Sequence, residues 1–322
     1  MFAAPLLLHI PDGLLSPLVS LLSWILTIAL LWVALRRVGD DLGERQVPLM
    51  GVMAAFIFAA QMINFPVAGG TSGHLLGGAL AAIALGPWAG MLVMASVVIV
   101  QGLLFQDGGL LVMGANILNM GLLTVAVGYG LYRLAPRGNR RLRLLLAGVG
   151  AWLSVMVGAF ATSMELWLSG TALLDLVLPA MLSVHALIGL GEALITVAAL
   201  SFLLRTRPDL IEEGNAQAGG RGWVAAGLLI SLVVVLLAPL ASANPDGLYR
   251  VARDLGFLDA RAQAPFRILP GYTIPFLGGS ALSTIIAGLL GALLVAGLAA
   301  LLFRLLRRQK RPNNHTGLDD FS

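Results

Sequence analysis

The sequence predicts an all-α fold, a polytopic helical membrane protein with about nine transmembrane helices (seven plus two) and its N-terminus outside. Three observations support this prediction. Hydrophobic residues make up 58% of the 322 residues and charged residues only 11%, whereas soluble domains average about 25% charged residues. Several uncharged stretches reach about 18 residues, enough to cross a hydrocarbon core of roughly 30 Å. Arginines gather in short clusters between these stretches.

The apolar stretches define the expected spans in order. They run roughly over 17–35, 48–63, 74–85, 88–105, 110–132, 143–164, 176–204, 223–241 and 280–303. The third span is unusual, because the 12 residues from His74 to Leu85 would rise only about 18 Å as a helix. Short or broken segments at membrane depth have to face protein or a cavity, which favours a binding site there.

Basic residues orient these spans. They follow spans one, five, seven and nine, so nine spans with an external N-terminus place every cluster in the cytoplasm, as the positive-inside rule requires. Eight spans, or an inverted first span, would split the clusters. Confinement to span ends also argues against a nucleic-acid partner. The residues are Arg36, Arg37, Arg45, Arg133, Arg137, Arg140, Arg141, Arg143, Arg205, Arg207, Arg221, Arg304, Arg307, Arg308, Lys310 and Arg311.

The polar stretch RTRPDLIEEGNAQAGGRG predicts a domain boundary between the seventh and eighth spans. An external loop at about 242–279 is expected between the last two spans. The expected parts are a doubtful N-terminal extension (1–8), a seven-span membrane domain (9–204), a cytoplasmic linker (205–222), a two-span domain (223–304) and a cytoplasmic tail (305–322).

Histidines are the candidate metal ligands. His9 and His74 both fall on the outer side, and His74 follows the glycine-rich loop 64–73, whose backbone can approach a small ligand closely. Two imidazoles on one face suit a late first-row divalent metal. The alternative is that each histidine caps a helix or lies in the interfacial belt. His315, in the tail, is expected to be solvated.

Other polar residues within spans have simpler explanations. His185 and Glu192 lie seven residues apart on one helix face, and we expect an internal hydrogen-bonded pair that ties spans together. Asn116 and Asn119 share a face of span five, and interhelical hydrogen bonds explain them adequately.

The sequence also excludes several kinds of chemistry. The absence of cysteine rules out disulfides, thiolate catalysis and zinc–thiolate sites. There is no GxSxG and no phosphate-binding GxxxxGK[ST] motif. We therefore expect no enzyme activity, no catalytic residues, no catalytic cofactor and no ATPase site within the chain.

Three motifs resemble the CbiM/NikM family, the substrate-binding membrane components of energy-coupling factor transporters for cobalt and nickel. They are HIPDGLL, FPVAGGTSGHLLGGALAAIALGPWAG and QGLLFQDGGLLVMGANILNMG, and the similarity covers about residues 8–205. The stretch ANPDGLYRVARDLGF (243–257) resembles the PDGLE domain, which is similar to the small component CbiN/NikN. Tyr249 replaces the final acid of that signature, so no role of that acid carries over.

The resemblance implies a metal site at Leu8, His9 and His74. In the family the mature chain begins Met-His, and the metal is held by the terminal amine, the adjacent amide nitrogen, that histidine's imidazole and a second imidazole from the GTSGH loop. Four nitrogens in a plane suit Ni²⁺, with Cu²⁺ as a competitor. If the site lacks the amine, the first candidate donors are the external polar residues Asp12, Asn64, Thr71 and Ser72.

An amine at Leu8 requires a mature N-terminus there. The leading MFAAPLLL has no basic region and too short an apolar stretch for a signal peptide. We expect translation to start at position 8, because an alternative bacterial start codon can be conceptually translated as leucine. The alternatives are proteolytic trimming and a site that works without the amine.

The expected function is capture of Ni²⁺ or Co²⁺ for uptake across the bacterial cell (inner) membrane. The resemblance implies ATP-binding subunits that act through a separate coupling transmembrane subunit, with the PDGLE-like domain helping to load or release metal and weakly favouring nickel. Two alternatives stay open. One is a self-sufficient secondary transporter with Glu192 as its coupling carboxylate; the other is an intramembrane metalloenzyme using His185 and Glu192.

Overall fold

The structure is a computed structural model that describes residues 8–41, 46–136, 138–206 and 222–309. The expected extension (apart from Leu8), most of the expected linker, the end of the tail and His315 lie outside these ranges.

Helices lie at all nine positions expected for spans, and the all-α membrane fold is confirmed. The main helices are α1 (Pro17–Asp41), α2 (Gln46–Gln61), α3 (Gly78–Leu85), α4 (Pro87–Val100), α5 (Met113–Asn116), α6 (Thr124–Tyr132), α7 (Arg140–Leu168), α8 (Leu174–Thr206), α9 (Gly222–Leu237), α10 (Gly247–Asp254) and α11 (Ala281–Gln309). Two π-helical stretches, η2 (Gln101–Phe105) and η3 (Ile117–Leu123), continue α4 and join α5 to α6.

Seven helical stretches in the described chain are long and apolar enough to cross a membrane. The other two expected spans correspond to α2, with 16 residues, and α3, with only 8. The third span differs from its predicted bounds because its helix begins at Gly78, whereas residues 74–77 have no regular structure. A span count of nine therefore stays a prediction.

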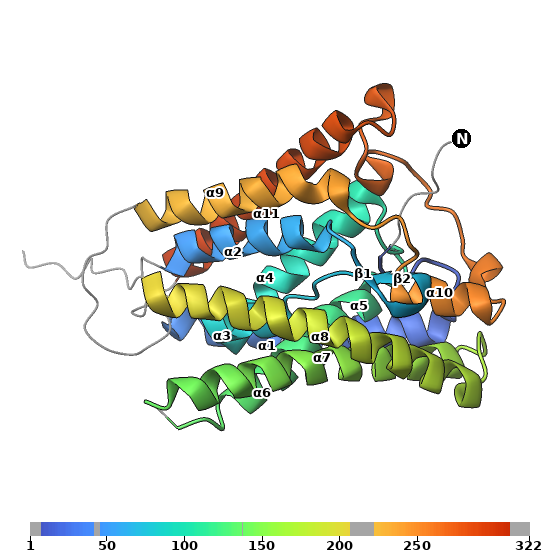
Figure 1. Cartoon of the computed structure of the whole chain (residues 1–322), viewed down its shortest axis with the longest axis horizontal. Helices are drawn as coiled ribbons and strands as arrows, with labels where there is room; N and C mark the ends of the chain where they lie inside the picture. The colour runs from blue at the N-terminus through green and yellow to red at the C-terminus, as the bar shows by residue number, and fades with distance from the viewer. Residues whose placement is uncertain (1–7, 42–45, 137, 207–221, 310–322) are drawn as a thin grey trace, which may run out of the picture.

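The helices run largely along the long axis of the molecule (Figure 1). The ends of α6 and α8 and the starts of α7 and α9 lie together at the left of the view, whereas α10 and the hairpin of β1 (Phe65–Val67) and β2 (Thr71–Gly73) lie at the right. Arg133, Arg140 and Arg205 belong to those left-hand ends. The shared end agrees with the arrangement expected from the positive-inside rule, and its cytoplasmic orientation stays a prediction.

The two-span domain packs directly against the seven-span domain. Both α9 and α11 contact α2, and α11 also contacts α4. At Gly291 of α11 an added Cβ would lie 2.1 Å from the ring of Phe58, so the absence of a side chain allows this close approach, as is common between membrane helices. The two domains therefore form one helical body, with the segment between α9 and α11 lying at the right-hand end in Figure 1.

Candidate metal centre

The segment that carries His9 is fixed by side chains on both sides of the histidine. The amide of Ile10 donates to Oδ1 of Asn116, and Nδ2 of Asn116 donates back to the Ile10 carbonyl, each over 3.0 Å. The carboxylate of Asp12 accepts from the amides of residues 110–112 over 2.9–3.2 Å. These contacts hold a segment without regular structure against the start of α5, so His9 is only 2% exposed.

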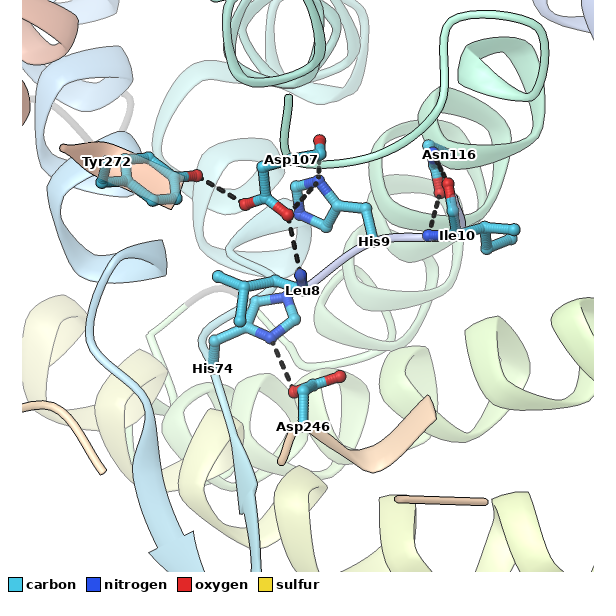
Figure 2. Close-up of polar contacts among 8 residues, drawn as sticks. All are labelled: Leu8, His9, Ile10, His74, Asp107, Asn116, Asp246 and Tyr272. Atoms are coloured by element: carbon cyan, nitrogen blue, oxygen red, sulfur yellow. Dashed lines mark hydrogen bonds and ion pairs between the residues drawn. The ribbon is translucent and has the colours of Figure 1, made fainter. Parts of the chain in front are cut away.

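Asp107 contacts the histidine and the residue before it (Figure 2). The π-helical stretch η2 ends at Phe105, and the next residue, Gln106, turns the chain sharply with a φ of 52°. The Asp107 carbonyl then lies 3.0 Å from Nδ1 of His9, and the backbone N–H of Leu8 donates to Asp107 Oδ1 over 2.7 Å. Because a carbonyl oxygen only accepts, Nδ1 of His9 carries the proton and Nε2 keeps a free lone pair.

His74 is positioned by two carboxylates. Directly after β2, the amides of Leu76 and Gly77 donate to the two oxygens of Glu192 over 2.6 and 2.8 Å. Nδ1 of His74 lies 3.0 Å from Oδ1 of Asp246. An ionised carboxylate only accepts, so His74 also has its proton on Nδ1 and a lone pair on Nε2.

The two imidazoles face one cavity. Their ring centroids are 5.6 Å apart at an interplanar angle of 60°. Two imidazoles that share one first-row ion, with metal–nitrogen bonds of about 2.0–2.1 Å, have centroids roughly 4.5–6.3 Å apart. Both Nε2 atoms are buried without a hydrogen-bond partner among the described residues, which is costly unless a ligand occupies them. The cavity, of roughly 60 Å³, is lined by residues that include Leu8, His9, His74, Asn119, His185 and Asp246.

The electrostatics differ between the two rings. Burial, partly offset by the charge of Asp107, lowers the pKa of His9 below the ordinary value of 6.5. Burial acts in the same direction on His74, but the charge and hydrogen bond of Asp246, with smaller contributions from Asp107 and Glu192, raise its pKa above 6.5. In the described chain no group of three or more His, Cys, Asp or Glu side chains could hold a metal, so further donors at this site would be backbone groups, water or another polar side chain of the cavity, such as Asn119.

The structure brings Leu8, His9 and His74 together but not the four supporting candidates, none of which lines the cavity. Asp12 caps the turn before α5. Ser72 bonds to residues 244 and 245, the carbonyl of Asn64 accepts from the amide of Ser242, and Thr71 pairs with Val67 in the hairpin.

Two expectations for polar residues were wrong. His185 and Glu192 do not form a pair, because Nδ1 of His185 donates to the carbonyl of Met181 in its own helix, while Glu192 is engaged by the amides after His74. Asn116 binds backbone ahead of α1 rather than another span. The interhelical role expected of Asn119 is confirmed, since its amide donates to Thr162 and Glu165 of α7.

Three residues at the site were missed by sequence reasoning: Asp107, Asp246 and Tyr272. The hydroxyl of Tyr272 donates to Oδ2 of Asp107 over 2.5 Å. Each acid lies in a motif quoted for the family resemblance, FQDGG and NPDGL. Acids are scarce in this chain and costly near a membrane, which is the signal that could have singled them out.

Comparisons with known proteins agree with the motifs. Residues 9–210 match the family CbiM, described as a cobalt uptake substrate-specific transmembrane region, and residues 221–308 match the PDGLE domain. A protein of Archaeoglobus fulgidus, provisionally named as fused nickel transport protein NikMN, is 39% identical over 93% of this chain and 99% of its own length. The fused nickel transport protein NikMN of Rhodobacter capsulatus is 30% identical, with 90% and 96% coverage. A crystal structure of a truncated transition metal transporter, 35% identical, aligns with a TM-score of 0.55 over 61% of this chain and 98% of that one.

Proposed function

We propose that this chain, which belongs to the CbiM family and carries a PDGLE domain, captures Ni²⁺ or Co²⁺ as the membrane component of a metal uptake system. The observation that carries the proposal is the pair of buried, unpartnered Nε2 atoms that face one cavity. Imidazole nitrogen suits both ions. A backbone carbonyl or carboxylate on the opposite ring nitrogen is the usual arrangement of a metal-binding histidine.

The ion would be held by His9 and His74 with a further donor at Leu8. The Leu8 nitrogen already lies 2.7 Å from an Asp107 oxygen, and a free amine there would bring a lone pair to the same cavity. Nδ1 of His9 faces the Asp107 carbonyl, so a chelate ring closed by Nδ1 and the His9 amide nitrogen would require the imidazole to turn. Binding through Nε2 does not. Asp107 and Asp246 supply negative charge that favours a divalent cation in a buried site.

Nickel is the first choice between the two ions. The two relatives that align over 93% and 90% of this chain carry nickel in their names, and the PDGLE domain is present here as well. Discrimination between nickel and cobalt would follow from the coordination plane, since a planar set of four nitrogens favours Ni²⁺.

We further propose that uptake is driven by ATP-binding subunits through a coupling transmembrane subunit in the bacterial cell membrane. The competing secondary transporter needs a carboxylate free to take up a coupling ion. Glu192, its candidate, accepts two backbone amides and is fully buried, which suits a structural role. The metalloenzyme alternative is disfavoured because His185 and Glu192 are not paired.

Uptake of radioactive nickel in cells separates these alternatives. The chain would be expressed with and without the coupling and ATP-binding subunits of the same genome, and with an ATP-binding subunit whose phosphate-binding lysine is replaced. We expect uptake only with the intact set, and no uptake by a His9→Ala, His74→Ala double variant. Undiminished uptake by the chain alone would favour the secondary transporter.

The donor at Leu8 has its own test. Intact-mass measurement of protein made from the native gene identifies the mature terminus, and calorimetric titration with Ni²⁺ then gives the affinity. We expect a terminus at position 8 and tight binding. A chain that keeps Phe2–Leu7 and binds Ni²⁺ equally tightly would refute an amine ligand.

A further inference from the structure

The external segment of the PDGLE domain contacts His74 directly and contacts Asp107, the partner of His9 (Figure 2). Asp246 lies 3.0 Å from Nδ1 of His74, and Tyr272 donates to the carboxylate of Asp107. Both residues are buried, at 4% and 5% exposure. The candidate metal centre is thus built from two domains whose contacting residues lie more than 160 positions apart in sequence.

The position of Asp246 is set by backbone pairing with the histidine loop. Residues 244–246 run beside β2, where the amide of Ser72 donates to the Pro245 carbonyl over 2.9 Å and Oγ of Ser72 donates to the Asn244 carbonyl over 2.7 Å. Ser72 and Asp246 form a parallel bridge. This short strand-like pairing places the Asp246 carboxylate next to His74, which follows Ser72 by two positions.

The Asp246 side chain forms a hydrogen bond with His74 rather than capping its own helix, α10. Asp246 is the N-cap residue of α10, yet its side chain makes no capping hydrogen bond. An aspartate in this position normally accepts a hydrogen bond from an amide of the first helical turn. The absence of this capping contact indicates that the carboxylate is positioned to interact with His74 instead.

Tyr272 is also held in an unusual state. Its φ of 58° is in the left-handed region, which is uncommon for a bulky residue and tends to persist at functional sites. The ring stacks on Phe105, with centroids 4.8 Å apart and planes 18° apart. Its hydroxyl is thereby directed at Asp107, whose other oxygen accepts from Leu8.

We propose that the PDGLE domain is an integral part of the metal centre, with Asp246 and Tyr272 as positioning residues. Asp246 keeps the proton of His74 on Nδ1 and so directs the Nε2 lone pair at the ion, while Tyr272 fixes Asp107 beside His9 and Leu8. The inference rests on the proposed function, because it concerns the same site. Loss of such an outer partner typically lowers metal affinity by about 10–100-fold without removing a ligand.

The test compares the full-length chain with three single substitutions at two positions. Asp246→Ala removes the acceptor of the His74 proton, and we expect affinity for Co²⁺ to fall by about 10–100-fold at unchanged stoichiometry. Asp246→Asn keeps an acceptor oxygen and should recover part of that loss. Tyr272→Phe keeps the stacked ring and removes only the hydroxyl, with an expected loss of a few-fold.

Spectroscopy separates positioning from general destabilisation. The ligand-field absorption of bound Co²⁺ reports its coordination geometry, so it should shift in both Asp246 variants. Matched controls are Asp259→Asn and Tyr249→Phe, which alter an exposed acid and a half-buried hydroxyl of the same external segment away from the cavity. Their affinity and spectrum should equal those of the unmodified chain.

The outcomes distinguish this inference from the proposed function. If His74→Ala abolishes binding while both Asp246 variants keep the original affinity and spectrum, the positioning role is refuted and the metal site stands. If His9→Ala and His74→Ala also bind normally, the site itself is wrong. Should Asp246→Ala fail to fold, Asp246→Asn decides alone, since an unchanged affinity and spectrum in that variant refutes the role.

Discussion

His9 and His74 reach the same cavity by different constructions. The ring of His9 is held by a backbone carbonyl of its own domain, that of Asp107, whereas His74 depends on a side-chain carboxylate of the PDGLE domain, that of Asp246. At His9 burial outweighs the charge of Asp107 and lowers the pKa, whereas at His74 the charge and hydrogen bond of Asp246, with smaller contributions from Asp107 and Glu192, outweigh burial and raise it. At His9 the PDGLE domain acts only through Tyr272 on Asp107, whereas at His74 it supplies the hydrogen-bond partner of the ring itself.

The largest expected effect is the loss of a metal ligand, and it tests whether both histidines bind the ion. His9→Ala and His74→Ala should each weaken Ni²⁺ binding by more than the roughly 100-fold that loss of an outer partner costs, because each removes a nitrogen donor. Calorimetric titration measures the affinity, and circular dichroism checks that the helices persist. If only one variant loses tight binding, the centre is not shared between the two rings.

The next effect concerns Glu192, whose carboxylate binds the backbone two and three residues after His74. Glu192→Ala leaves the amides of Leu76 and Gly77 without their acceptor in a fully buried place. The unfolding free energy should fall by about 1–3 kcal/mol, the cost of a buried unpaired donor, and Ni²⁺ affinity should fall because His74 loses its support. Thermal melting in detergent gives the first quantity. Glu192→Gln, which keeps one acceptor oxygen, serves as the control and should lose less of both.

The pH dependence sharpens the electrostatic contrast. A second proton on the His74 ring occupies Nε2 and blocks metal binding. Because the pKa of His74 is raised above 6.5, Ni²⁺ affinity should already decline as the pH is lowered towards 6.5. The limit is about tenfold per pH unit for each proton displaced, or about 1.4 kcal/mol. His9, whose pKa is lowered, should add its own loss only at lower pH.

Titrations at several pH values check this order. In Asp246→Ala the onset should move to lower pH, because the group that raises the pKa of His74 is gone, whereas Asp259→Asn should leave it in place. An affinity that stays flat from pH 8 to 5 would contradict ligation by imidazole.

The smallest expected effect lies on the His9 side. Asp12→Ala removes the acceptor of three amides at residues 110–112, in the turn ahead of α5. We expect a loss of about 1 kcal/mol in unfolding free energy, as for a helix cap, and a smaller loss of Ni²⁺ affinity than in Glu192→Ala. Equal effects of the two variants would mean that the two halves are supported alike.

Much of the fold could be predicted from the sequence because hydropathy directly reports the lipid-facing length of a helix. The helices α7 and α8 lie within a few residues of their predicted spans. The prediction was weakest at residues 74–77, where a buried carboxylate more than 100 positions away satisfies the backbone in place of a helix. No local sequence pattern predicts such a distant hydrogen-bond partner.

The candidate site likewise contains residues that the sequence could predict and contacts that it could not. His9 and His74 could be chosen because imidazoles are rare and costly beside spans. The same scarcity could have singled out Asp107 and Asp246 as acids, but not their pairing with the rings, because they become neighbours of the histidines only through long-range packing. Asp12 illustrates the converse: an acid near the histidine looked like a donor, yet its oxygens are taken by backbone amides.

The covalent connection between the two domains has a consequence in mass action. Thr206 and Gly222 are joined through residues 207–221 of the same chain, so docking of the PDGLE domain on α2 is an intramolecular event. Short linkers set effective concentrations of about millimolar, which no separately expressed subunit at cellular abundance would match. Every copy of the chain therefore carries Asp246 in a fixed one-to-one ratio with His74, and occupancy of that contact does not change when expression rises or falls.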